Sequence, residues 1–397
     1  MVRILILTSS TGGGHDARAK AFVAWMQRLY PDQVDTRVES MLEDSSGLAA
    51  FGVWFYNFIQ RYAPWFHIPY FLLIEGLSLF GSKRVSLGRS YYESVVLEYR
   101  PHLVFSVHDC LNRGYFYTAR ELLGANHVRC ATYCSEFSGK FGYSRNWVDR
   151  SVDLFISRTS EAHDYAVKAL GLPEGSGSVY GQFLEPHAYD GMMNHDEAYR
   201  FVAKDLGLSS DRKTILLGTG GAGANNHLDV LEAIKSFGHE YQAIVVCGRN
   251  EATFQEVSDW QERNPTFRCH VLAYTDDIYR LMQVSDMILT RGGTTTCSEA
   301  LHFGCLIVFN GIGGVMPQES LTLNYFQNAE AGVPIGSAHA FANILGRWAR
   351  FPEEKRAMKI RFGELKFQGD PSAGPRHLVE LATEAMEAEK SMMGSDD

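Results

Sequence analysis

The sequence predicts an α/β protein built from two Rossmann-like, doubly wound domains that face each other across a cleft. Its 397 residues are too many for one ordinary hydrophobic core, so two domains are expected. A strand, a glycine turn and a helix follow one another at residues 2–29, the opening unit of a parallel α/β domain. The same pattern starts afresh near residue 213, after a loosely patterned stretch.

That loose stretch, residues 182–212, predicts the hinge between the domains. We therefore expect an N-terminal domain at 1–190 and a second domain at 191–345. The helical pattern over 346–397 predicts C-terminal helices that pack back toward the N-terminal domain.

Composition excludes several classes of protein. A hydrophobic content of 45% with 21% charged residues is typical of a globular protein, and a formal net charge of −9 argues against a nucleic-acid partner. The seven cysteines are scattered without a CxxC pair, which favours a reducing compartment. No apolar run is long enough for a bilayer span, and the short N-terminal apolar run is predicted to be a first strand rather than a signal peptide.

The first glycine turn carries a candidate catalytic base. His15 follows a triple glycine and falls in the first turn of the predicted helix, whose positive end lowers an imidazole pKa and keeps the ring neutral. A histidine that merely caps a turn is the alternative. Gly13 and Gly14 favour function, because bulkier residues would block a ligand from the ring.

Two more polar residues follow predicted strands of this domain. His108 ends the strand at 103–109, and Glu136 lies just past the strand at 129–133. Ligands of open parallel sheets bind at these carboxyl ends, although each residue alone is more often structural. Glu136, or another nearby acid, is the candidate partner that positions His15.

Residues 48–80 are unusually aromatic, and prolines break the stretch into pieces too short to span a membrane. Aromatic residues followed by Lys83, Arg84 and Arg89 are typical of an element that lies in a membrane interface. Helices that simply cover the sheet are an equally good interpretation. The candidate membrane or acceptor contacts are Trp54, Phe55, Phe58, Trp65 and Phe66.

A third glycine turn, between a strand at 287–290 and a helix, has the features of an anion site. Glycines let the backbone approach a ligand, and a helix N-terminus directs unpaired N–H groups at it. Glu299, two turns into the helix, is placed to accept hydrogen bonds from sugar hydroxyls. An ordinary turn capped by threonines is the alternative. The candidate substrate contacts here are Arg291, Gly292, Gly293, Thr294, Thr295 and Glu299.

A formal GxGxxG match at 218–223 raises a dinucleotide-dependent enzyme as a possibility. The strand that follows ends in Gly248 and Arg249, without the acid that would hold the ribose of such a cofactor. A dehydrogenase is therefore not favoured.

Over roughly residues 2–345 the chain resembles the two-domain family-28 glycosyltransferases. The segments that carry the resemblance are TSSTGGGHDARAKAF, TGGAGANN, AYTDDIYRLMQVSDMILTRGGTTTCSEAL and GGVMPQES. Within the family it is most similar to the monogalactosyldiacylglycerol synthases and processive diacylglycerol glucosyltransferases. The resemblance implies a GT-B fold, a UDP-sugar donor, inversion at the anomeric carbon, a lipid acceptor and no essential metal or other cofactor.

The resemblance also implies residue roles. His15 matches the catalytic base and Glu299 the ribose-binding acid, while Glu136 stands where the family usually has aspartate. The remaining matches are the phosphate loop (Gly220, Gly221, Ala222), the turn beside uracil (Tyr274, Thr275) and the sugar contacts (Gln318, Glu319). The family's glycine is missing from Pro317-Gln318-Glu319, which leaves the hexose open. The replacement at Glu136 and the lack of the family's histidine near Trp147 leave the acceptor lipid open.

We therefore expect an inverting transferase that moves a hexose from a UDP-hexose to a lipid, diacylglycerol being the expected acceptor. It would work as a peripheral protein on the cytoplasmic side of a membrane. The alternatives are a UDP-sugar 2-epimerase, a lipid II-type N-acetylglucosaminyltransferase and a lipid-binding module of the membrane surface.

Overall fold

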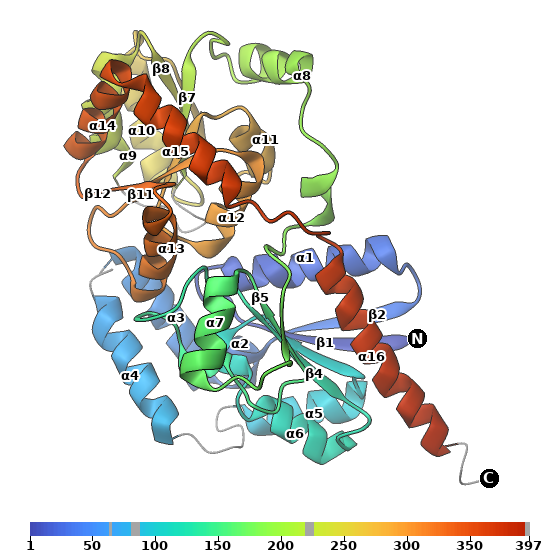
Figure 1. Ribbon diagram of the computed structural model, residues 1–397. Helices are drawn as coiled ribbons and strands as arrows, with labels where there is room; N and C mark the ends of the chain where they lie inside the picture. Colours follow the sequence, from blue (N-terminus) through green and yellow to red (C-terminus); the bar gives the residue numbers. More distant parts are fainter. Residues whose placement is uncertain (63–65, 81–87, 219–225, 394–397) are drawn as a thin grey trace. The chain divides into compact units, whose positions relative to one another are not determined.

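A computed structural model describes residues 1–62, 66–80, 88–218 and 226–393 of the chain, which form two compact units (Figure 1). The N-terminal unit comprises Met1–His187 and Phe367–Asp397, and the C-terminal unit comprises Ala188–Lys366. Within the segment 346–397, α16 (Ala373–Met393) lies in the N-terminal unit. Helix α14 (Ala338–Arg350) and helix α15 (Pro352–Glu364) lie in the C-terminal unit.

The N-terminal unit is built on a six-stranded parallel sheet with strand order β2-β1-β3-β4-β5-β6. Because the strand order reverses between β1 and β3, the carboxyl ends of these two strands flank the crevice where such sheets bind ligands. The strands are β1 (Val2–Thr8), β2 (Val34–Ser40), β3 (Leu103–Ser106), β4 (Arg129–Cys134), β5 (Leu154–Ser157) and β6 (Gly177–Val179).

Helices surround this sheet. Helix α1 buries Ala21, Phe22 and Trp25, as its apolar periodicity predicts, and α16 packs along β1, β3 and β4 (Figure 1). The helices of the unit, besides α16, are α1 (Gly14–Leu29), α2 (Met41–Ser45), α3 (Gly47–Tyr62), α4 (His67–Phe80), α5 (Arg89–Tyr99), α6 (Tyr115–Leu123) and α7 (Ser160–Leu170). None of the helices among the described residues has both the length and the apolar character needed to cross a bilayer.

The C-terminal unit has a six-stranded parallel sheet in the order β12-β11-β10-β7-β8-β9. This is the Rossmann order, with its reversal between β7 and β10, so the loops after these strands flank the ligand crevice. The strands are β7 (Lys213–Gly218), β8 (Tyr241–Val246), β9 (Cys269–Leu272), β10 (Met287–Thr290), β11 (Leu306–Asn310) and β12 (Val333–Ile335).

The helices of the C-terminal unit, besides α14 and α15, are α8 (His195–Arg200), α9 (His227–Ile234), α10 (Glu251–Arg263), α11 (Ile278–Gln283), α12 (Thr294–Phe303) and α13 (Pro317–Asn328). The two doubly wound parallel sheets confirm the predicted fold class. The helical pattern at 340–366 is divided between α14 and α15 because Pro352 cannot continue a preceding helix.

Helix α7 begins at Ser160, and its N-cap Thr159 accepts the N–H of Ala162 through its side chain. One detail of the N-terminal unit differs from expectation. The strand expected at 103–109 ends at Ser106. Its last residues leave the sheet, and this places His108 and Asp109 in the turn that follows β3.

Candidate functional site

The loop after β1 sets the position of His15. Gly12 and Gly13 both have left-handed backbone angles, with φ of 73° and 76°, which glycine adopts without strain. Gly13 is the N-cap of α1, and His15 lies in its first turn. The His15 Nδ1 atom is 2.7 Å from the carbonyl oxygen of Val107. A carbonyl only accepts hydrogen bonds, so Nδ1 carries the proton and Nε2 presents a lone pair.

The neighbours of His15 keep the ring neutral. Burial lowers its pKa well below the ordinary value, and the positive charges of His108 and Arg18 lower it further. The direction agrees with the expectation from sequence, but burial rather than the helix terminus is the largest cause. A guanidinium nitrogen of Arg18 also lies 3.1 Å from Nδ1. It cannot donate to a protonated Nδ1, so the shorter carbonyl contact sets the tautomer.

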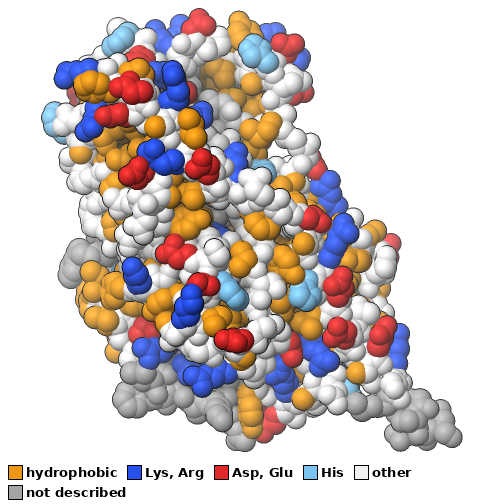
Figure 2. Space-filling view, in the orientation of Figure 1, with side chains coloured by type: hydrophobic (Ala, Val, Ile, Leu, Met, Phe, Trp, Pro, Cys, Tyr) orange, Lys and Arg blue, Asp and Glu red, His pale blue; other side chains and the backbone are white. Residues whose placement is uncertain are grey.

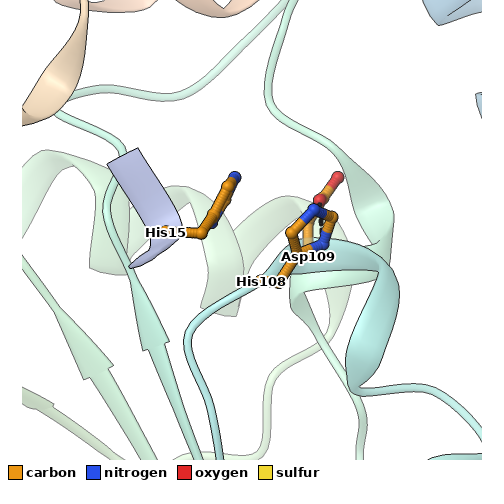
Figure 3. A group of neighbouring side chains, drawn as sticks. All are labelled: His15, His108 and Asp109. Carbon is orange, nitrogen blue, oxygen red and sulfur yellow. Dashed lines mark ion pairs between the residues drawn. The ribbon is translucent and has the colours of Figure 1, made fainter. Parts of the chain in front are cut away.

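Figure 3 shows a second histidine and an acid beside His15. The rings of His15 and His108 have their centroids 4.1 Å apart. His108 contacts Thr11 Oγ1 at 2.8 Å through Nε2 and Asp109 Oδ1 at 3.1 Å through Nδ1. Burial alone would raise the pKa of Asp109, but the hydrogen bond and electrostatic effect of His108 hold that pKa far below its usual range. Asp109 is therefore ionised.

Asp109 was not predicted as a site residue from the sequence. The signal was present, because Asp109 follows His108 at the carboxyl end of β3, next to β1 at the switch point. The sequence does not show that β3 pairs directly with β1.

His15, His108 and Asp109 also form a group with metal-ligating chemistry. One ligand atom from each lies within 4.8 Å of the others. Ligands about 2 Å from a zinc ion are at most about 4 Å from one another, so the group would have to contract to hold one. Both ring nitrogens of His108 already contact neighbours. The expectation that the protein needs no metal stays a prediction.

Glu136 lies deeper in the same unit, 5% exposed. Its Oε1 accepts a hydrogen bond from Trp147 Nε1 at 3.3 Å, and its Oε2 is buried without a hydrogen-bond partner among the described residues. Burial raises the pKa of Glu136 to about 7, against the opposing effect of Arg18. The ring centroid of Trp147 is 6.2 Å from that of His15. Glu136 thus contacts Trp147, whereas Asp109 belongs to the His15 group.

In the C-terminal unit, the glycine turn after β10 leads directly into α12. A Cβ atom on Gly292 would lie 2.8 Å from the carbonyl oxygen of Glu319, so a larger residue does not fit there. Gly293 is the N-cap of α12, with no side-chain cap and open space around its missing Cβ. The N-cap residue of α12 is therefore a glycine and not one of the threonines. Thr294 and Thr295 are in the first turn, and Glu299 is half-buried in the second.

Two of the predicted substrate contacts bond to each other. Arg291 donates to both carboxylate oxygens of Glu319, at 3.0 and 3.1 Å, and to the carbonyl of Gly314 at 2.7 Å. Glu319 also accepts the backbone N–H of Met316 at 3.0 Å. This nearly buried pair holds the loop before α13. The adjacent Gln318 has a buried Oε1 without a hydrogen-bond partner among the described residues.

A cavity of about 250 Å³ lies past the carboxyl ends of β8 and β9. The guanidinium carbon of Arg249 is 4.9 Å from the ring centroid of Tyr274, so a planar group entering here meets one aromatic face and one cation. The side chain of Thr275 accepts the N–H of Asp277 and shapes the adjacent turn. The cavity is lined by Gly248, Arg249, Glu251, Phe254, Ala273 and Tyr274.

The aromatic stretch forms α3 and α4, which pack through aromatic rings such as Phe55 against Tyr70. One side of α3 is buried, and the other exposes Trp54 (56%) and Phe58 (43%). Phe55 and Phe66 are half-buried and lie edge to face. Hydrophobic side chains gather over the two helices in Figure 2. We call this surface the α3–α4 face; its exposed members are Leu48, Phe51, Trp54, Phe58, Ile68, Leu72 and Leu73.

Four predicted residues, namely Gly220, Gly221, Ala222 and Trp65, lie outside the described residues. Leu48, Phe51, Ile68, Leu72 and Leu73 were not singled out from the sequence as members of the exposed face. Periodicity shows that a helix is amphipathic but does not show which apolar stripe meets the protein.

Two Rossmann-type sheets, each with polar groups at its switch point, define the GT-B class of fold, and solved structures agree. MurG from Acinetobacter baumannii is similar with a TM-score of 0.59 and 14% identity, covering 96% of this chain and 99% of that one. A putative UDP-N-acetylglucosamine 2-epimerase from Listeria monocytogenes has a TM-score of 0.58, 14% identity and 100% and 97% coverage. Anabaena HepE in complex with UDP-glucose has a TM-score of 0.52, 12% identity and 98% and 100% coverage.

Within that class, residues 214–310 match the glycosyltransferase family 28 C-terminal domain, and this confirms the predicted resemblance. Monogalactosyldiacylglycerol synthase 2 of Arabidopsis thaliana is 23% identical over 87% of this chain and 73% of its own length. The processive diacylglycerol β-glucosyltransferase of Bacillus pumilus is 27% identical over 54% of this chain and 53% of its own. The family match and these relatives indicate a glycosyltransferase.

Proposed function

We propose that the protein is an inverting glycosyltransferase that moves a hexose from a UDP-hexose to the hydroxyl group of a lipid, diacylglycerol being the acceptor. The observation that carries the proposal is the family-28 match over residues 214–310. That match contains the glycine turn after β10, the uncapped start of α12, and Glu299. A relative that matches 87% of this chain is named a monogalactosyldiacylglycerol synthase, and one that matches 54% is named a processive diacylglycerol β-glucosyltransferase.

The donor is assigned to the C-terminal unit. The positive end of the α12 dipole suits a diphosphate, and Glu299 on the next turn suits the ribose hydroxyls. The cavity beside Tyr274 and Arg249 suits the uracil ring. The unpartnered Oε1 of Gln318 suits a hydroxyl donor of the hexose. Glu319 holds the loop through Arg291, and it supports the sugar site rather than lining it.

The acceptor and the proton chemistry are assigned to the N-terminal unit. The acceptor oxygen attacks C1 of the hexose while its proton passes to Nε2 of His15. The bond from C1 to the diphosphate oxygen breaks, and its electron pair leaves with UDP. The products are the glycolipid, UDP and a protonated His15. Asp109 is the acid whose charge favours that protonated ring.

The lipid acceptor reaches the site from a membrane surface in this proposal. The α3–α4 face presents aromatic and aliphatic side chains to solvent, which is the composition of an interfacial element. This favours a peripheral protein that binds the bilayer holding its acceptor.

A UDP-sugar 2-epimerase is the second candidate, because the Listeria structure matches the whole chain with a TM-score as high as 0.58. An epimerase needs no acceptor, so it gives the α3–α4 face no role. An N-acetylglucosaminyltransferase of the lipid II type differs from the main proposal in sugar and acceptor alone.

The test is to incubate the protein with a panel of UDP-hexoses, including UDP-N-acetylglucosamine, with and without vesicles containing diacylglycerol. Products are identified by mass and chromatography. Lipid-dependent UDP release with a glycosylated diacylglycerol supports the proposal. A changed sugar nucleotide without lipid identifies an epimerase. Vesicle binding without UDP binding or release leaves a lipid-binding module and overturns the proposal.

A further inference from the structure

The loop that carries His15 is bonded to the helix that carries the exposed aromatic residues. Asn57 of α3 accepts the N–H of Gly12 through Oδ1 at 3.0 Å and donates to the carbonyl of Ser10 through Nδ2 at 3.1 Å. One side chain thus satisfies two backbone groups of the glycine loop, three and five residues before His15. Asn57 lies one residue from Phe58, a member of the α3–α4 face.

Helix α4 has an equivalent connection to the other side of the site. Its Glu75 accepts hydrogen bonds from Ser144 Oγ at 2.6 Å, from the backbone N–H of Arg145 at 3.2 Å and from Arg145 Nε at 2.9 Å. These residues begin the short helical turn Arg145–Trp147, and Trp147 donates to Glu136.

That turn is also bonded to the segment of His108. The side chain of Asn112 donates to the carbonyl of Asn146 at 3.1 Å and to the carbonyl of His108 at 3.0 Å. The two helices of the α3–α4 face are therefore connected by hydrogen bonds to the two histidines that lie together, α3 to the loop of His15 and α4 to the loop of His108.

Other bonds also hold the glycine loop, but from elements without exposed apolar faces. Glu43 accepts from Ser9 and Ser10, and Asp16 accepts from Thr8 and Ser10. The bonds from Asn57 join this loop to an element whose other side faces solvent with aromatic residues. Asn57 therefore links the α3–α4 face to Gly12 and to Ser10, through one hydrogen bond each.

We propose that Asn57 and Glu75 are positioning residues, which couple occupation of the α3–α4 face by a lipid bilayer to the order of the His15 and His108 loops. The inference rests on the proposed function and deepens it. Binding at a membrane would rigidify α3 and α4 and, through these side chains, the site where the acceptor hydroxyl loses its proton. Turnover would then be greater for acceptor in a bilayer than for the same acceptor in solution.

The first experiment is independent of activity. Backbone hydrogen exchange of the full chain is measured by mass spectrometry with and without phosphatidylcholine vesicles containing diacylglycerol. In the unaltered protein we expect slower exchange both in 48–62 and in 9–18 when vesicles are added. In Asn57→Ala we expect the protection of 48–62 to persist while that of 9–18 is lost. Protection confined to 48–62 in the unaltered protein, or equal protection of 9–18 in both proteins, would overturn the coupling.

Controls separate coupling from a loss of stability. Asn194 caps α8 in the C-terminal unit through a comparable side-chain bond, so Asn194→Ala removes a cap without touching the loop. It should retain the protection of 9–18. Should Asn57→Ala fail to fold, Asn57→Asp keeps the acceptor for Gly12 and removes the donor to Ser10. Glu75→Ala tests the second connection, with the loss of protection expected in 144–147 and 106–112.

The second experiment measures transfer to diacylglycerol in vesicles and to a short-chain diacylglycerol in solution. We expect the vesicle-dependent turnover of Asn57→Ala to be at least about 10-fold lower than that of the unaltered protein, with little change in the KM for the UDP-hexose. Its activity on the soluble acceptor should change much less. Equal losses on both acceptors would overturn the coupling. If the unaltered protein transfers a hexose to neither acceptor, the proposed function is overturned. The exchange experiment would still decide the coupling in that case.

Discussion

The Nδ1 atom of His15 and the carbonyl oxygen of Val107 are 2.7 Å apart. Val107 is the first residue after β3, and His15 lies at the start of α1, so this bond joins the two segments at the switch point of the N-terminal sheet. It commits the protonated nitrogen of the ring to the backbone and leaves the lone pair of Nε2 for the role of base in the proposed reaction. No carboxylate is needed to set the tautomer, which leaves Asp109 free to act through its charge.

Replacing His15 by alanine should lower turnover by about 10²–10⁴-fold, the usual contribution of a general base. UDP binding, measured by calorimetry, should change little because the donor is assigned to the other unit. His195→Ala is the matched control, since that side chain is 94% exposed. Full activity of His15→Ala would remove the residue from the mechanism.

The pH dependence of the unaltered protein should reflect the low pKa of His15. Because burial lowers this pKa, kcat/KM should fall only at pH values below the ordinary pKa range of histidine.

Glu136 should make the free energy of unfolding depend on pH. Its pKa is raised from 4.5 to about 7 in the folded protein, so the folded state binds the proton more tightly than the unfolded chain does. Stability from this group is present at acidic pH and decreases as the pH rises from about 4.5 to about 7, by roughly 3 kcal/mol in all. The free energy of unfolding of Glu136→Gln, measured with denaturant, should depend less steeply on pH in that window. The same dependence in both proteins would contradict the raised pKa of Glu136.

Breaking the Arg291–Glu319 pair should destabilise the donor loop. Arg291→Met leaves the Glu319 carboxylate nearly buried without its cation, at a cost of about 3 kcal/mol, the low end for buried pairs because the Arg291 side chain is 16% exposed. UDP affinity should fall with it. The control is Arg347→Met, which breaks an exposed pair with Glu354 and should leave unfolding unchanged. Equal effects of both variants would refute a special role for the buried pair.

Removing the carboxylate of Glu299 should weaken UDP binding. Hydrogen bonds to a charged group contribute about 1.5–3 kcal/mol, so Glu299→Ala should raise the Kd for UDP about 10- to 100-fold by calorimetry. Glu256→Ala, an exposed glutamate on α10 of the same unit, should bind UDP normally. If both variants bind equally well, the ribose site lies elsewhere.

The exposed rings of α3 should determine membrane binding. Replacing Trp54 and Phe58 by serine removes apolar surface from the α3–α4 face without touching its buried side. Each ring lost should lower vesicle affinity about 10-fold or more in a sedimentation assay. Leu97→Ser on α5 removes a comparably exposed apolar side chain, 52% exposed, from another surface and should bind vesicles normally. If the doubly substituted protein sediments with vesicles as the unaltered protein does, the role of α3 is purely structural.

The sequence by itself determined the order of strands and helices, the glycine turns after β1 and β10, and the amphipathic character of α3. These are local properties, since strand and helix periodicities and left-handed glycines depend on neighbouring residues. It also placed His15, Glu299 and Tyr274 where sheets of this class bind ligands.

Tertiary structure alone decided which of these residues meet. Asp109 joins His15 because β3 pairs with β1, whereas Glu136 follows β4, one strand further along. Arg291 and Glu319, both predicted as substrate contacts, bond to each other because α13 returns to the end of β10. Asn57 reaches Gly12 because α3 lies beside the loop that follows β1. Hydrogen bonds between distant residues depend on strand order and on packing, which no local periodicity encodes.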